Sequence, residues 1–352
     1  MKVTNLFARG SSAIFVKALA VAITLYFVLG PVPTADAQKF RFFDTLYSDW
    51  ALLVVGADGK VNWKILKNEN PSHPPGILRE IPFGESETDV IPNSGDYTGD
   101  GLDDYAVYRD NSGLIPPINT YIIGRSDGGP TQWTQYGDWE TDFVGGEGDY
   151  DGDNKMDLTI QRQVSGKLEW WVLRSSTNTI SVFYWGSTFN TDIPLGGADY
   201  TGDGIDDPAV VRINGTTGAV TWYVGTTAGT GITQLQWGNY NTDWIVPGGD
   251  YDGDGKADFM LWRGFGNGVW YLRTAAGATT YTQFGIPDSD TTESDLALRG
   301  GDYDGDGKTD IALYRPSDNA FWVYRSSGGG GQYQKFGAAG EDIVPLGNFG
   351  VY

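Results

Sequence analysis

One acidic motif, Asp-Tyr-[Asp/Thr]-Gly-Asp, recurs five times in this chain and constrains its fold more than any other feature. The copies begin at Asp96, Asp149, Asp199, Asp250 and Asp302, so successive copies lie 53, 50, 51 and 52 residues apart. A repeat of this length indicates an array of similar supersecondary units, each burying its apolar face against its neighbours.

Further features repeat in register with the motif and predict the strands of each unit. An apolar strand follows each motif and ends in Arg: Arg109, Arg162, Arg212, Arg263 and Arg315. The next strand carries a large aromatic residue that we expect in the core: Tyr121, Trp170, Trp222, Trp270 and Trp322. Each pattern is too short for a helix and has the aromatic and β-branched character of a strand.

Two more features occur six times, once more than the acidic motif. One is a strand that ends in an aromatic residue and Gly: Phe83-Gly84, Tyr136-Gly137, Trp185-Gly186, Trp237-Gly238, Phe284-Gly285 and Phe336-Gly337. The other is an Asp before the strand that leads into the next motif: Asp89, Asp142, Asp192, Asp243, Asp295 and Asp342. Each unit therefore has four strands, and there are six units.

The two ends of the repeat predict how the array closes. The first unit begins near Asp49 with no acidic motif before it, and the chain finishes at 345–349 with a strand of the type that precedes a motif. We expect this last strand to complete the first unit. Four strands in about fifty residues match a propeller blade. The predicted fold is all-β, a six-bladed β-propeller in a single domain over residues 38–352, whose closure leaves no open ring edge.

The first 37 residues have the pattern of a secretory signal peptide. Lys2, Arg9 and Lys17 precede or flank an apolar run of 13 residues from Ala18 to Gly30, and small residues follow at 35–37. The run is short for a membrane span, and we expect cleavage before Gln38. The alternative is an uncleaved membrane anchor. The expected location is secreted or extracellular, in the periplasm or at the cell surface, with no membrane insertion after cleavage.

Charge and cysteine content restrict the partners. The whole chain has 24 basic and 45 acidic residues, and the predicted signal removes three basic residues and one acidic residue, leaving 21 minus 44, or −23. Such a surface repels nucleic acid and anionic membranes and favours cations. The chain has no Cys, so an exported protein of this kind must hold its loops together by means other than disulfides.

The fifth motif shows why these loops suit a calcium ion. Counted from Asp302 as position 1, carboxylates occupy positions 1, 3, 5 and 9, and the backbone carbonyl of position 7 is available: Asp302, Asp304, Asp306, Lys308 and Asp310. Hard oxygen ligands at this spacing suit Ca²⁺. An EF-hand would need Glu at position 12, where this chain has Leu313. The alternative is that Asp and Gly only form polar turns.

The other loops vary this pattern in two ways. Position 6 requires a left-handed backbone and is Gly in four loops and Asn154 in the other. The first and third loops have Thr98 and Thr201 at position 3, and each adds an acid at position 8, Asp103 and Asp206. We interpret these as compensating acids, so that each loop keeps four carboxylates.

Residues 249–258, Gly-Asp-Tyr-Asp-Gly-Asp-Gly-Lys-Ala-Asp, resemble the FG-GAP and VCBS repeats of integrin-α-type propellers. The resemblance implies about five structural Ca²⁺ ions, each in the loop between the first and second strands of a blade. It also implies further ligands at the equivalent positions: Asp96, Thr98, Asp100, Leu102, Asp104, Asp149, Asp151, Asp153, Lys155, Asp157, Asp199, Thr201, Asp203, Ile205, Asp207, Asp250, Asp252, Asp254, Lys256 and Asp258. This family more often has seven blades than six.

The face opposite the calcium loops offers two further predictions. The Asp that opens the first strand and the Arg that ends the second share this face, and we expect them to pair, as in Asp192 with Arg212. An anion-binding ring of Arg is the alternative. Three consecutive blade-to-blade crossings also carry an aromatic residue: Trp139, Phe189 and Tyr240. These form a candidate ligand-binding arc, unless each ring packs down between blades.

Catalytic residues are scarce in this sequence. The chain has one His, His73, and no Cys, so a Ser-His or Cys-His nucleophile has one candidate base. The sequence therefore predicts a binding or adhesion module for a glycan or a cell-surface or extracellular protein, not an enzyme. A carbohydrate-active enzyme of the polysaccharide lyase type on the same propeller is the alternative.

Overall fold

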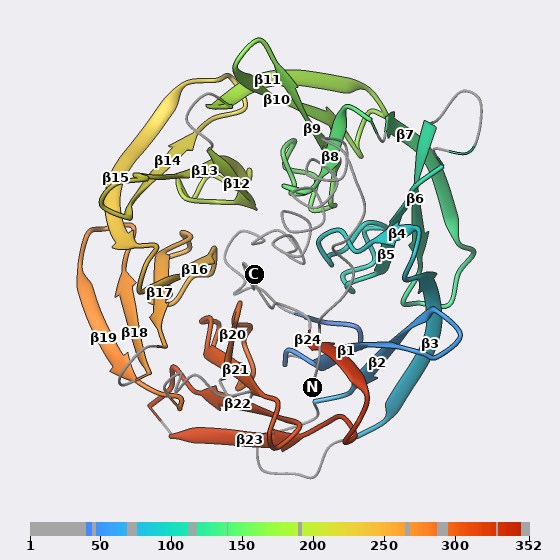
Figure 1. The fold of residues 1–352 in the computed structure, drawn as a ribbon, viewed down its shortest axis with the longest axis vertical. Coiled ribbons are helices and arrows are strands. Elements are labelled where there is room, and N and C mark those ends of the chain that lie inside the picture. The colour runs from blue at the N-terminus through green and yellow to red at the C-terminus, as the bar shows by residue number, and fades with distance from the viewer. Residues whose placement is uncertain are drawn as a thin grey trace.

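Six four-stranded antiparallel sheets form a closed ring in the computed structural model (Figure 1). The structure describes residues 40–43, 47–68, 76–111, 113, 118–138, 140–188, 192–264, 268–286, 295–328 and 330–345. No helix occurs in these ranges. The predicted six-bladed β-propeller is therefore confirmed. The predicted signal peptide at 1–37 lies outside the described residues, as does His73.

The blades follow one another along the chain, each running from an inner first strand to an outer fourth strand. Blades 1 to 3 contain β24 (Asp342–Pro345), β1 (Trp50–Val55), β2 (Lys60–Leu66) and β3 (Leu78–Glu85); β4 (Asp89–Val90), β5 (Tyr105–Arg109), β6 (Ile118–Gly124) and β7 (Gln132–Asp138); and β8 (Asp142–Val144), β9 (Leu158–Val164), β10 (Lys167–Leu173) and β11 (Ile180–Ser187).

Blades 4 to 6 repeat the same order around the ring. They contain β12 (Ile193–Ala198), β13 (Asp207–Ile213), β14 (Ala219–Gly225) and β15 (Gly231–Asn239); β16 (Trp244–Pro247), β17 (Phe259–Arg263), β18 (Val269–Arg273) and β19 (Thr279–Gln283); and β20 (Leu296–Leu298), β21 (Ile311–Arg315), β22 (Ala320–Tyr324) and β23 (Gly331–Lys335).

The C-terminal strand closes the ring, as the repeat count predicts. Strand β24 pairs with β1, with Val344 opposite Leu53 and Asp342 opposite Val55. Blade 1 therefore takes its innermost strand from the far end of the chain, and its other three strands from the start of the described chain (Figure 1). This pairing joins blade 6 to blade 1 through the chain itself.

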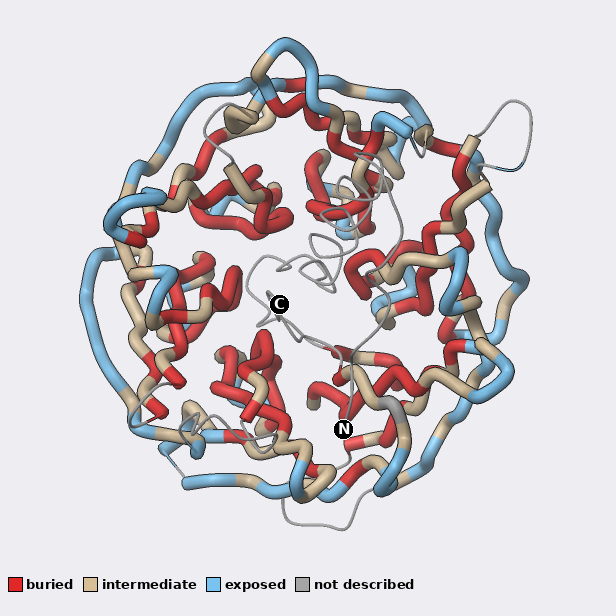
Figure 2. Tube along the Cα trace, in the orientation of Figure 1, coloured by how far each residue is buried: buried red, intermediate tan, exposed pale blue. Residues whose placement is uncertain are grey.

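The apolar cores lie between neighbouring blades. One cluster combines Trp222 of blade 4 with Phe259 and Leu261 of blade 5, and another combines Trp50 of blade 1 with Tyr314 of blade 6. Buried residues gather on the inner strands, whereas the outer strands are largely exposed (Figure 2). Adjacent blades thus stabilise each other, as expected for repeats that cannot bury their faces alone.

The aromatic-Gly pairs end the outer strands where the next blade comes close. At Gly238 the backbone φ is +103°, and a Cβ atom there would lie 2.9 Å from the Leu261 side chain of blade 5. The indole Nε1 of Trp222 donates to the carbonyl of Trp237, the residue before this Gly. Glycine is required here because both the left-handed backbone and the close approach exclude a side chain.

One predicted core residue is displaced by one position. In blade 6 the core position belongs to Phe321, which is 1% exposed, whereas Trp322 is only partly buried. The register explains the difference, because Arg315 pairs with Ala320 and places Phe321 where Trp270 stands in blade 5. Trp322 instead lies beneath the guanidinium of Arg315, 4.6 Å from its ring centroid. Trp322 therefore packs against the core only in part, and Phe321 fills the core position that the sequence pattern assigned to Trp322.

Candidate metal centres

Each acidic loop is wrapped around the carboxylate at its first position. In the fifth loop, residues 302–310 between β20 and β21, Asp302 Oδ1 accepts the N–H of Gly305 at 2.6 Å. Asp302 Oδ2 accepts the N–H of Gly307 at 2.9 Å. The other four loops have the same two bonds. The first carboxylate thereby fixes the loop's curvature.

The carboxylate at position 9 joins the loop to the rest of its blade. Asp310 Oδ2 accepts the N–H of Tyr303 at 2.8 Å, and Oδ1 accepts the N–H of Ser326 at 2.7 Å. Ser326 lies in the turn between the third and fourth strands, so that this turn and the acidic loop share one face of the propeller. The acidic loop and the turn between the third and fourth strands of the blade are therefore held together on this face.

Three loops bring three carboxylate oxygens within 4.8 Å of one another. The groups are Asp149, Asp151 and Asp157; Asp250, Asp252 and Asp254; and Asp302, Asp304 and Asp306. Such a set of hard oxygen donors fits Ca²⁺ or a similar hard cation. A bound cation would neutralise these charges, and the loop residues named would hold it.

Burial and neighbouring acids raise the pKa values of the carboxyls at position 9. Burial, followed by the charges of neighbouring carboxylates, raises the pKa of Asp310 to about 7, and the pKa values of Asp104, Asp157, Asp207 and Asp258 are likewise raised to about 7. In each case burial has the largest effect. Without a cation these groups resist ionisation, which is the behaviour expected of a site built for positive charge.

The two loops with Thr at position 3 differ from the other three. Among the described residues they form no comparable group of three carboxylates. Asp206, interpreted from the sequence as a compensating acid in its own loop, instead accepts the backbone N–H of Asp149 in the preceding loop at 2.8 Å. That interpretation was wrong, because position 8 faces the neighbouring blade. Asp199, Asp203 and Asp207 remain the acids of the third loop.

Serine side chains that were not predicted from the sequence support the carboxylates of two loops. Ser326 Oγ donates to Asp306 Oδ2 at 2.7 Å, and Ser327 Oγ donates to Asp304 Oδ2 at 2.5 Å. Ser175 and Ser176 do the same for Asp153 and Asp151. The signal was present as the pairs Ser175-Ser176 and Ser326-Ser327 at the same place in two repeats.

A sixth loop without the acidic motif completes the series at residues 41–49. Asp49 stands at its position 9: its Oδ2 accepts the N–H of Phe42 at 2.9 Å and its Oδ1 accepts the N–H of Asn68 at 2.9 Å. These bonds match those of Asp310. Position 1 is Arg41, a cation in place of the first ligand, so this loop lacks the metal-binding pattern, while its described residues keep the hydrogen bonds of position 9.

Backbone hydrogen bonds connect the six loops into a ring. The N–H at position 8 of each loop donates to the carbonyl at position 1 of the preceding loop, at 2.7 to 2.8 Å. The pairs are Met156 to Asp96, Asp206 to Asp149, Ala257 to Asp199, Thr309 to Asp250, Ser48 to Asp302, and Asp103 to Arg41. The sixth loop therefore closes the circle, and each loop is positioned by its neighbour.

On the opposite face, the predicted Asp–Arg pairs form in five blades. Arg212 Nε donates to Asp192 Oδ1 at 2.6 Å and its Nη2 donates to Oδ2 at 2.8 Å. Equivalent pairs join Arg109 to Asp89, Arg162 to Asp142, Arg263 to Asp243 and Arg315 to Asp295. The guanidinium groups are engaged by acids, which disfavours the alternative of an anion-binding Arg ring.

Tyr240 is the one member of the predicted aromatic arc within the described residues; Trp139 and Phe189 lie outside them. The Tyr240 side chain is 41% exposed. Its crossing is well fixed, since Tyr240 N donates to Gly218 O at 2.8 Å and Asn241 N donates to Asn239 Oδ1 at 2.9 Å. At this position the ring does not pack down between blades.

Fold and loops together define a six-bladed β-propeller with acidic loops on one face. Residues 250–313, which span the fourth and fifth loops, match the FG-GAP-like repeat family, in agreement with the predicted resemblance. No curated protein matches the chain. Among solved structures, a protein of unknown function from Bacteroides caccae aligns over 85% of this chain and 99% of its own, at 10% identity and a TM-score of 0.43. Within the described residues, the structure contains no helix with the length and apolar character of a membrane span.

Proposed function

We propose that this protein is exported and acts as a calcium-stabilised binding module for a glycan or an extracellular protein. FG-GAP-type blades are consistent with a binding role, and no cysteine is available to hold the loops. The acidic loops can take the place of disulfides. Cations held at loop positions 1, 3, 5, 7 and 9 stabilise the folded ring because they bind only to the folded state.

The observation that supports a ligand most directly is Tyr240. A large aromatic ring that is 41% exposed, on a crossing fixed by hydrogen bonds, is poised for stacking against a ligand. The exposed side chain of Asn241 follows it and carries an amide suited to sugar hydroxyls or to a protein surface, whereas the amide of Asn239 holds the crossing itself. Rigid aromatic contacts with polar neighbours are typical of recognition sites.

A binding screen against glycans, polysaccharides and extracellular proteins tests this proposal, with the calcium-loaded protein beside a variant carrying Trp139→Ala, Phe189→Ala and Tyr240→Ala. We expect a ligand that the parent binds and the variant loses, while both melt at the same temperature. An absence of any ligand contradicts the proposal. Conversion of a polysaccharide into unsaturated products would instead establish the lyase alternative.

A further inference from the structure

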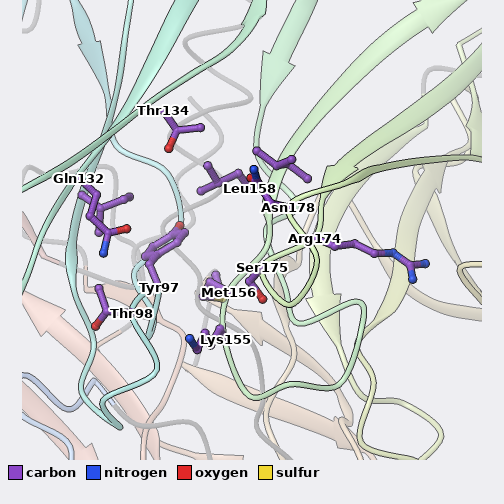
Figure 3. A pocket seen from close by; sticks show the side chains of 12 residues that line it. Tyr97, Thr98, Gln132, Thr134, Lys155, Met156, Leu158, Arg174, Ser175 and Asn178 are labelled. Atoms are coloured by element: carbon purple, nitrogen blue, oxygen red, sulfur yellow. The ribbon is translucent and has the colours of Figure 1, made fainter.

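A pocket of about 240 Å³ opens between blades 2 and 3 on the face of the acidic loops (Figure 3). Blade 2 contributes Tyr97 and Thr98 from the first loop and Gln132 and Thr134 from β7. Blade 3 contributes the second loop and the turn between β10 and β11. This volume lies just below the ~300–1,000 Å³ of drug-sized sites, so the pocket suits a ligand about the size of one ring.

The walls of the pocket combine an apolar surface with neutral hydrogen-bonding groups. Ile123, Met156, Leu158 and Leu173 provide apolar contact, and Thr98, Gln132, Thr134, Ser175 and Asn178 provide hydroxyl or amide groups. A pyranose ring has a matching surface, because its C–H face is apolar and its edge carries hydroxyls. Neutral donors and acceptors of this kind fix the orientation of a ligand in a pocket.

The charge of the lining is opposite to the charge of the protein. None of the twelve lining residues is acidic and two are basic, Lys155 and Arg174, in a chain with 45 acidic residues. Arg174 extends away from the other labelled side chains in Figure 3 and donates to Ser181 Oγ at 3.2 Å. Lys155 therefore supplies the positive charge of the pocket.

Lys155 is held in place without being neutralised. Its stem crosses Gly99 of the first loop so closely that a Cβ atom there would lie 2.2 Å from the Lys155 Cε. Its ammonium forms no ion pair among the described residues. The acids nearest to Lys155 in the chain, Asp153 and Asp157, belong to the predicted calcium site of its own loop. Cations held by these loops would neutralise the carboxylates and leave the Lys155 ammonium available to an anionic group.

We infer that this pocket binds one carboxylated sugar residue, of the uronic acid type, within a polysaccharide. The carboxylate pairs with Lys155, and the ring lies on the wall formed by Leu158 and Leu173. The inference extends the proposed function to a second site, on the face opposite the aromatic arc. Thr98 and Lys155 belong to two acidic loops, so binding depends on calcium.

The test is calorimetric titration of the calcium-loaded protein with trigalacturonic acid and with a neutral galactose trisaccharide. Lys155→Met keeps the stem over Gly99 and removes the charge, and we expect at least tenfold weaker binding of the acidic sugar. Lys335→Met is the control, because Lys335 is an exposed lysine on β23 of blade 6, outside the pocket lining and the acidic loops. This control is expected to bind as the parent does.

A second pair of variants tests the position of the site independently of charge. Gln132→Trp fills the mouth of the pocket from the exposed end of β7 and should abolish binding, whereas Gln135→Trp on the same strand lies outside the lining and should not. Binding that survives both Lys155→Met and Gln132→Trp overturns this inference. So does binding of the neutral trisaccharide alone, although the proposed glycan-binding function would then stand. No binding of any glycan or protein overturns both.

Discussion

At the residue scale, each Asp–Arg pair is held in place by several contacts at once. The Asp192 side chain is only 1% exposed, and besides Arg212 it accepts the backbone N–H of Ser187 at 2.7 Å. The Arg212 guanidinium also lies 4.6 Å from the ring centroid of Tyr223. A single carboxylate thus holds the end of one blade and the start of the next together.

Asp192→Asn should destabilise the protein by about 1–3 kcal/mol, because it removes a charge-assisted acceptor and leaves buried donors poorly satisfied. The measurement is equilibrium unfolding in urea at saturating calcium. Asp318→Asn is the control, since Asp318 is an exposed acid 3.7 Å from the Arg315 guanidinium. A change at Asp192 no larger than the change at Asp318 would show that the pair contributes little.

Side chains that orient a metal ligand without binding the metal themselves should change the affinity of the site for calcium. Ser327→Ala removes the hydroxyl that orients Asp304 in the fifth loop. We expect about tenfold weaker calcium binding at that loop, in line with the usual effect of losing a group that orients a ligand. Calcium titration of this variant against Ser317→Ala, which lies on the opposite side of blade 6, measures it. Equal affinities would mean that Asp304 does not ligate.

At the element scale, the acidic loops predict an unusual pH dependence. The carboxyls at position 9 have pKa values raised to about 7 in the folded protein, above the value of about 4 expected when unfolded. The folded state therefore binds more protons, and its stability is greatest below pH 4 from this effect and falls as the pH rises through 7.

Chelator-treated protein should consequently melt at a lower temperature at pH 8 than at pH 5. Calcium binds the ionised carboxylates, so the difference in melting temperature between calcium-loaded and chelated protein should grow over the same interval. Differential scanning calorimetry at pH 5, 6, 7 and 8 with and without calcium tests this. A chelated protein that gains stability toward pH 8 would show that these acids ionise freely.

At the element scale, features encoded within one repeat could be predicted from the sequence, whereas contacts between blades could not. The spacing of Asp302 to Asp310 predicts the loop because the ligands lie close together in the chain. The sixth loop was missed because only Phe42 and Asp49 keep the pattern once Arg41 replaces the first Asp. Asp206 and the pocket at Lys155 depend on contacts between blades, which spacing within one repeat does not reveal.

At the scale of the whole molecule, closure of the ring depends on four residues at the end of the described chain. Without β24, the inner edge of β1 loses its partner and blade 1 keeps three strands. Truncation after Gly340 should lower the melting temperature by several degrees or more and promote association through the open edge.

Size-exclusion chromatography and thermal melts of the truncated protein test this closure. Glu341→Gln is the matched control, because it removes the 2.6 Å ion pair with Lys64 while keeping the strand. A truncated protein that melts with the control and remains a monomer would show that blade 1 is stable without its innermost strand.

The six blades and the five acidic loops could be predicted from the sequence because each corresponds to one copy of a repeated motif. The strand register within a blade was less so: Phe321 rather than Trp322 occupies the core because the pairing of Arg315 with Ala320 sets the phase. Two adjacent aromatic residues give the same sequence signal, and only the pairing distinguishes them.

The central prediction is that the acidic loops bind cations, and a calcium titration of chelator-treated protein by isothermal calorimetry tests it directly. We expect between three and five ions per chain, three from the loops with Asp at position 3. Each site saturated a hundredfold above its dissociation constant should add about 2.7 kcal/mol to the free energy of unfolding. Less than one ion per chain, with an unchanged melt, would mean that the acidic loops are only polar turns.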